Sequence, residues 1–228
     1  MTDRFHALLA GDVAPLSRWL KSAGWRDGIQ LVVVIVIGSG VYGATMGLWR
    51  DPLQALYTAI KFPAMVLLTC GGNSAFNGCL ASLLGSGLGF RQTTLAILMS
   101  FAVMAIILAA FAPVMLFLLW NTPPLDADSE FASHGITLLS HVAIIAGAGF
   151  AANRRLLGLI AAHARRRSDA WRVLAGWLAG NLVLGSQLAW ILRPFIGSPN
   201  LPVQFLRPDP LTGSFFEAIL RAFRNLIH

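Results

Sequence analysis

Five long apolar stretches, none with an Asp, Glu, Lys or Arg near its middle, constrain this 228-residue chain more than any other feature. They cover about residues 30–49, 62–84, 93–120, 136–152 and 171–192. Roughly 20 apolar residues in a helix cross the hydrocarbon core of a bilayer, with a usual range of about 17–25. The sequence therefore predicts an all-α fold, a polytopic membrane helical bundle of five transmembrane helices.

The composition supports a membrane environment and argues against a soluble, nucleic-acid-binding domain. Only 12% of the residues are charged, against about 25% in ordinary soluble domains, and the mean hydropathy is +0.68. A net charge of +7 in a soluble protein would suggest nucleic acid as a partner. Here the lipid bilayer is the better explanation, because the charges segregate between alternate connecting segments.

That segregation predicts the orientation. If the N-terminus is cytoplasmic, 11 of the 17 basic residues lie on cytoplasmic segments. The six on the other side are Arg50, Lys61, Arg193, Arg207, Arg221 and Arg224. Cytoplasmic loops are enriched in Lys and Arg, so we expect a cytoplasmic N-terminus and an external C-terminus. Of the 17 basic residues only Lys21 and Lys61 are lysine, which indicates the codon bias of a GC-rich bacterial genome and predicts the bacterial inner membrane.

Three regions follow from these patterns. Residues 1–28 form a cytoplasmic N-terminal segment with a short amphipathic helix at the interface. Residues 29–193 form the transmembrane domain, and residues 194–228 form a Pro-rich tail followed by a second amphipathic helix. The tail is too apolar for a disordered spacer, so we expect an ordered lid over the bundle or a docking strip for a partner.

The start of the second span carries a helix-initiation signal. Asp51 suits the N-cap, Pro52 the first helical position and Gln54 the third. Pro63 lacks the N–H that would continue the helix. We expect a short surface helix that turns into the span near residue 62, with the Lys61 side chain reaching the headgroups.

Amides in the second span are the most suggestive feature within the membrane. Asn73 and Asn77 are four residues apart and share a helix face. Polar groups in hydrocarbon need partners, so they either join helices or line a hydrated path. The candidate intramembrane polar cluster is Asn73, Ser74, Asn77, His141, Asn181 and Gln187.

Two further sets of residues predict binding surfaces. Small residues at helical spacing allow helices to approach closely, within the chain or with a partner protein or second copy. This helix-packing set is Ser39, Gly43, Gly47, Gly147, Gly176 and Gly180. Clustered arginines beside a span attract anionic lipid headgroups and also determine topology. The candidate anionic-lipid set is Arg154, Arg155, Arg165, Arg166 and Arg167.

Catalysis and metal binding have weak support. Ser39 lies between two glycines, but a serine nucleophile needs a base within hydrogen-bond reach, and only His141 is available. Cys70 and Cys79 lie on opposite faces of one predicted helix, about 13 Å apart along its axis, with no metal ligands at suitable spacing. We expect no enzymatic activity, no metal and no cofactor.

The stretch Gly40–Gly47 and the stretch Leu53–Pro63 resemble the opening half of small bacterial five-span proteins of the Yip1 type. The resemblance covers the first three spans, about half the chain. It implies a helical bundle without enzymatic activity, and eukaryotic relatives in that family act in membrane trafficking. From the small-residue helix faces and the arginine cluster we expect an integral membrane scaffold or accessory protein that binds partner proteins or lipids through them. The alternative is a small transporter or channel component whose path is lined by the polar cluster.

Overall fold

The computed structural model describes residues 2–83, 88–121, 130–164, 166–197 and 201–227, and within these residues all regular structure is helical. The helices are α1 (Thr2–Ala10), α2 (Val13–Ser22), α3 (Trp25–Leu48), α4 (Pro52–Leu83), α5 (Phe90–Trp120), α6 (Glu130–His163), α7 (Arg167–Ile191) and α8 (Phe215–Ile227). Five of them, α3 to α7, are long and apolar enough to cross a membrane. The predicted all-α fold with five membrane-spanning helices is confirmed.

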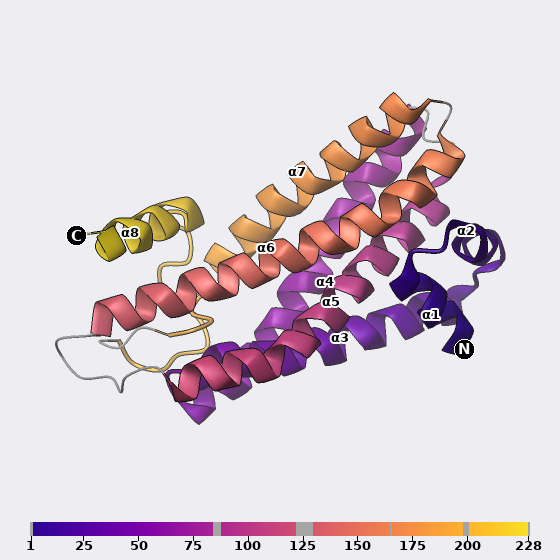
Figure 1. Ribbon diagram of the computed structural model, residues 1–228. Coiled ribbons are helices and arrows are strands. Elements are labelled where there is room, and N and C mark those ends of the chain that lie inside the picture. The colour runs from indigo at the N-terminus through magenta and orange to yellow at the C-terminus, as the bar shows by residue number, and fades with distance from the viewer. Residues whose placement is uncertain (1, 84–87, 122–129, 165, 198–200, 228) are drawn as a thin grey trace.

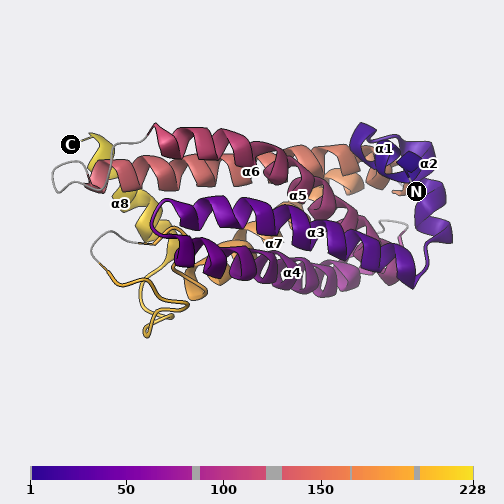
Figure 2. The ribbon, with the colours of Figure 1, turned by 90° about the horizontal axis from the view of Figure 1, so that it is seen from below.

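The long helices lie side by side in an elongated bundle (Figures 1 and 2). Helix α3 packs most extensively against α4 and α5, α6 packs against α5 and α7, and α7 packs against α4. Helices α1 and α2 lie at one end of the bundle, and α8 with the tail that precedes it lies at the other (Figure 1). We call these the N-terminal end and the C-terminal end.

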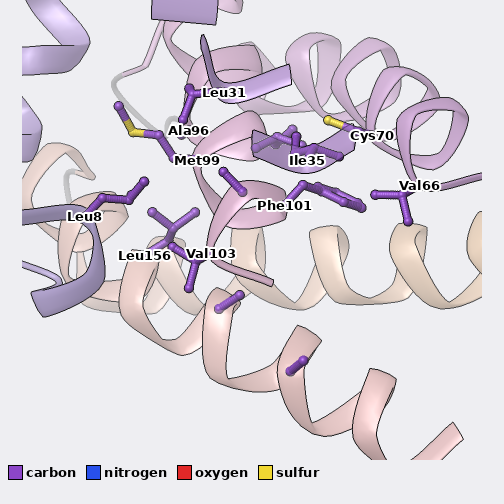
Figure 3. Packing of buried hydrophobic residues seen from close by; sticks show 14 of the residues in the cluster. Leu8, Leu31, Ile35, Val66, Cys70, Ala96, Met99, Phe101, Val103 and Leu156 are labelled. Atoms are coloured by element: carbon purple, nitrogen blue, oxygen red, sulfur yellow. The ribbon is translucent and has the colours of Figure 1, made fainter. Parts of the chain in front are cut away.

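Large apolar side chains and close backbone contacts both hold the bundle together. Figure 3 shows Leu31 of α3 beside Ala96 and Met99 of α5, and Phe101 of α5 beside Val66 of α4, all of them buried. Elsewhere α3 and α4 are too close for a side chain: a Cβ added to Gly43 would lie 2.7 Å from the carbonyl oxygen of Thr58. Glycine at that position lets the two backbones touch.

The outward faces of the long helices are apolar. Exposed side chains on these faces include Val33, Ile37, Val41, Phe111, Phe117, Phe150, Leu182 and Val183. In a soluble protein so much exposed apolar surface would cause association. Contact with the acyl chains of a bilayer accounts for it.

Helix α4 differs from the sequence prediction at its beginning. It is one helix from Pro52 to Leu83 and continues through Pro63, so the separate surface helix is wrong. Lys61 does not reach the headgroups, since only 2% of the residue is exposed. The tail covers it, as described below.

Candidate functional site

Two of the predicted amides meet a third from α7. The Asn73 side-chain nitrogen Nδ2 donates a hydrogen bond to Asn181 Oδ1 at 2.5 Å, and Asn77 Nδ2 donates to both oxygens of Asn73. Asn73 and Asn77 are buried. A Cβ at Gly180 would lie 2.7 Å from Asn73 Oδ1, so α4 and α7 are in tight contact here. The amides thus join two helices.

The other members of the predicted cluster lie differently. Ser74 is buried on α4 beside the amides, whereas Gln187 is exposed on α7. His141 pairs with α3: its Nδ1 is 2.9 Å from the Tyr42 hydroxyl. The two rings are perpendicular, with centroids 5.4 Å apart, and both residues are buried. The structure therefore divides the predicted cluster into an amide group and a His–Tyr pair.

The His–Tyr pair also bears on the possibility of a serine nucleophile. The Ser39 hydroxyl donates to the carbonyl oxygen of Ile35 in its own helix, while the His141 Nδ1 atom is occupied by Tyr42. The imidazole Nε2 atom has no hydrogen-bond partner among the described residues. Ser39 and His141 are thus not a nucleophile–base pair.

A site that the sequence did not reveal lies at the C-terminal end, where the tail crosses α4. We call residues 193–197 and 201–213 the strap. The ammonium of Lys61 donates to the carbonyl oxygen of Phe205 at 2.6 Å and to that of Pro194. It also lies 5.3 Å from the centroids of the Phe195 and Phe205 rings. The buried charge is therefore stabilised by carbonyl dipoles and aromatic faces.

Two neutral residues on the same face of α4 extend this contact. The Gln54 amide nitrogen donates to the carbonyl oxygens of Pro194 at 2.9 Å and Phe195 at 3.2 Å. The Thr58 hydroxyl lies 2.7 Å from the carbonyl oxygen of Phe195 and donates to it. Gln54, Thr58 and Lys61 follow the i, i+4, i+7 spacing of one helix face, which was the only sequence signal for this site.

Arg193 fixes the remainder of the strap. Its guanidinium donates to the carbonyl oxygens of Asp209 at 2.7 Å and Pro210 at 2.9 Å and stacks 4.0 Å from the Trp190 ring centroid. Nearby, a hydrogen bond from the Thr212 hydroxyl holds the pKa of the Asp209 carboxyl below its usual value. These contacts hold the strap against the end of α7.

The predicted lipid-binding arginines lie at the N-terminal end. Arg154 and Arg155 are exposed on α6, as is Arg166 just before α7. Arg165 lies outside the described residues, as does the Arg167 side chain. Arg154 and Arg155 border an open hollow of about 400 Å³ together with Phe150 and Ala151. Two neighbouring cations therefore face a concave, partly apolar surface.

The predicted packing residues divide between internal contacts and an open face. Gly43 and Gly47 face α4, and Gly180 faces the amides of α4. Ser39 is fully buried on α3, and Gly176 is half-buried on α7. By contrast, a Cβ added to Gly147 would have nothing within 4 Å. The small face of α6 is therefore left uncovered by the rest of the described chain.

No protein-family model matches the chain, and no curated protein or solved structure is significantly similar to it. Over the part of the chain that the structure describes, no three His, Cys, Asp or Glu side chains gather as a metal site requires.

Proposed function

We propose that this chain is an integral membrane scaffold or accessory protein, which binds partner proteins or lipids and carries out no catalysis of its own. The observation that carries the proposal is the pairing of Asn73 with Asn181 across a tight helix contact. A transport path needs polar groups that face water, whereas the amides of Asn73 and Asn181 bond to each other. Buried amides in this arrangement stabilise a helix bundle.

The charge distribution supports a cytoplasmic N-terminal end within this proposal. The N-terminal helices, the end of α6 and the start of α7 lie at the same end of the bundle (Figure 1). The exposed Arg154, Arg155 and Arg166 belong to this end of α6 and to the residue before α7. Basic residues are retained on the cytoplasmic side of membranes. A bacterial inner membrane and the Yip1-type relationship remain part of the proposal, on the sequence patterns alone.

Thiol labelling of the amide region tests the scaffold against a transport path. Both native cysteines, Cys70 and Cys79, are free and are first replaced by alanine. Ser74→Cys is nearly isosteric and places a thiol beside the amides. In sealed vesicles we expect this thiol to resist a membrane-impermeant maleimide, because it is packed between helices.

Two exposed positions serve as controls for the labelling. Asn121→Cys, just after α5, and Ser168→Cys, in the first turn of α7, are both exposed. They lie at opposite ends of the bundle, so each should react from one side of the membrane only. Rapid labelling of Ser74→Cys in vesicles where both controls behave in this way would refute the scaffold proposal.

The second candidate, a small transporter or channel component, is favoured by two buried atoms. The Asn77 side-chain oxygen and the His141 Nε2 atom have no hydrogen-bond partner within the described residues. Water in a polar path would supply partners to both. The same labelling experiment separates the two candidates, since water at the amides would carry the reagent to Ser74→Cys.

A further inference from the structure

The outer face of α6 combines an uncovered apolar stripe with a cationic end. Ile136, Ala143, Gly147, Phe150 and Arg154 are all exposed, and their spacing of 7, 4, 3 and 4 residues places them on one side of the helix. The stripe has small residues in its middle and a large ring near its end. It therefore forms a shallow track that runs along the helix to a positive charge.

The cationic end of the α6 stripe has the positive charge and hydrogen-bond donors of a phosphate-binding site. Arg154 and Arg155 border the hollow described above, and neither guanidinium has a hydrogen-bond or carboxylate partner in the described chain. Carbon atoms of the Arg155 side chain lie 3.7–3.8 Å from the position of a Cβ on Gly11, so the turn between α1 and α2 supports the arginine stem. Two adjacent guanidinium groups can bind the oxygens of one phosphodiester.

The length of the stripe matches one leaflet of a bilayer. With a rise of 1.5 Å per residue, Gly147 lies about 10 Å and Ala143 about 16 Å along the axis from Arg154. Half of a hydrocarbon core about 30 Å thick is about 15 Å. An acyl chain whose headgroup is at Arg154 would thus lie along the track from Phe150 to Ala143.

We propose that this stripe and its two arginines, which we call the α6 lipid site, bind an anionic phospholipid. Its phosphodiester contacts Arg154 and Arg155, and one acyl chain lies over Gly147. This deepens the function proposed above and depends on it, because it names a lipid as one partner of the scaffold.

A second copy of the chain fits the same face less well. Two copies in one membrane share their orientation, so a two-fold axis lies along the membrane normal. Pairing through the stripe would then bring the arginines of both copies to the same depth, side by side. Like charges at that distance repel, whereas an anionic headgroup neutralises them.

Native mass spectrometry of the full chain in neutral detergent tests the site. The protein is titrated with phosphatidylglycerol, which is anionic, and separately with phosphatidylcholine, which is zwitterionic. We expect preferential retention of phosphatidylglycerol. The double variant Arg154→Gln/Arg155→Gln should weaken that binding roughly thirtyfold, or roughly fivefold for each charge removed. Circular dichroism verifies that the variant keeps its helices.

Two further variants separate this site from general surface charge. Arg18→Gln removes an exposed cation of α2 at the same end without touching the hollow, so its lipid binding should stay within about twofold of the original. Gly147→Leu fills the track, where a side chain meets nothing, and should reduce the binding of both lipids while keeping the fold.

Three results would overturn the proposal. The first is unchanged phosphatidylglycerol binding by the double arginine variant. The second is a loss of this binding in Arg18→Gln as large as that in the double variant. The third is a dimer of the original chain that Gly147→Leu dissociates. Each is distinguishable from failure of the scaffold proposal, because thiol labelling at Ser74→Cys reports on the amide region and does not involve this face.

Discussion

Replacing Lys61 tests whether one buried cation holds the strap on α4. Lys61→Met keeps an unbranched, flexible side chain of similar length and removes the ammonium, with its hydrogen bonds to the carbonyl oxygens of Pro194 and Phe205. We expect the strap to open more often, while the long helices remain packed. The effect should be local, since the lost contacts all join α4 to the strap.

The structure sets the expected magnitude. A hydrogen bond to a charged group contributes about 1.5–3 kcal/mol, so two such bonds give an upper limit of about 6 kcal/mol. Burial of the ammonium offsets part of this, because desolvation of a charge costs several kcal/mol. In the variant, the Pro194 carbonyl keeps its bond from Gln54, and water can reach the half-exposed Phe205. We expect a net loss of about 2 kcal/mol, or roughly thirtyfold in the opening equilibrium.

Hydrogen exchange in lipid nanodiscs measures this opening. The amide of Arg207 is informative, since it donates to the Arg193 carbonyl across the strap. Its exchange should accelerate roughly thirtyfold in Lys61→Met. The matched control is Thr58→Val, which removes one neutral hydrogen bond of about 1 kcal/mol and should accelerate exchange about fivefold. Unchanged exchange in Lys61→Met, or equal acceleration throughout α3 and α4, would refute the local role of Lys61.

Two other predictions concern the helix contacts and the end of the strap. Gly43→Ala should lower the free energy of unfolding by about 1–3 kcal/mol, because its Cβ would press on the carbonyl oxygen of Thr58. The control Gly147→Ala has open space around its Cβ and should leave the free energy of unfolding unchanged. Thermal unfolding compares the two variants. The folded-state pKa of the Asp209 carboxyl is lowered, and the hydrogen bond from the Thr212 hydroxyl contributes most to this. The stabilisation of the strap by this carboxylate should therefore be complete above its unfolded pKa of about 3.9 and disappear as the pH falls through the lower folded pKa. The NMR chemical shift of the Thr212 methyl group should follow this loss of stabilisation as the pH falls. Asp209→Asn should abolish the pH dependence of that shift. A pH dependence that survives the substitution would show that another group is responsible.

The sequence predicts the features of this fold that depend on the surrounding lipid rather than on contacts between particular helices. The five spans follow from the apolar stretches, since hydrocarbon excludes charge whatever the tertiary contacts are. The predicted cluster offered the amides of α4 three partners on other helices, namely His141, Asn181 and Gln187. Periodicity restricts each amide to a helix face, but it does not determine which neighbouring helix lies opposite.

The strap contacts could not be predicted in the same way. Lys61 and Phe205 are 144 residues apart, and the strap contributes backbone carbonyls, which every residue has. The prolines indicated that the tail is not a helix, and nothing in the pattern indicated what it covers. The polar face of Gln54, Thr58 and Lys61 was a visible signal. Only Lys61 carried a prediction, that its side chain reaches the headgroups, because a lysine near a membrane boundary ordinarily reaches water.

The cations Lys61 and Arg193 at the C-terminal end differ from Arg154 and Arg155 at the N-terminal end in how their charge is satisfied, and this contrast supports a role in binding. At the C-terminal end, Lys61 and Arg193 donate to carbonyl oxygens of the strap, so the chain itself satisfies them. At the N-terminal end, Arg154 and Arg155 are exposed beside a hollow and an uncovered helix face. A topology signal alone requires positive charge at that end, but it requires neither the hollow nor the stripe that leads to it. An anionic lipid bound along α6 accounts for all three features together.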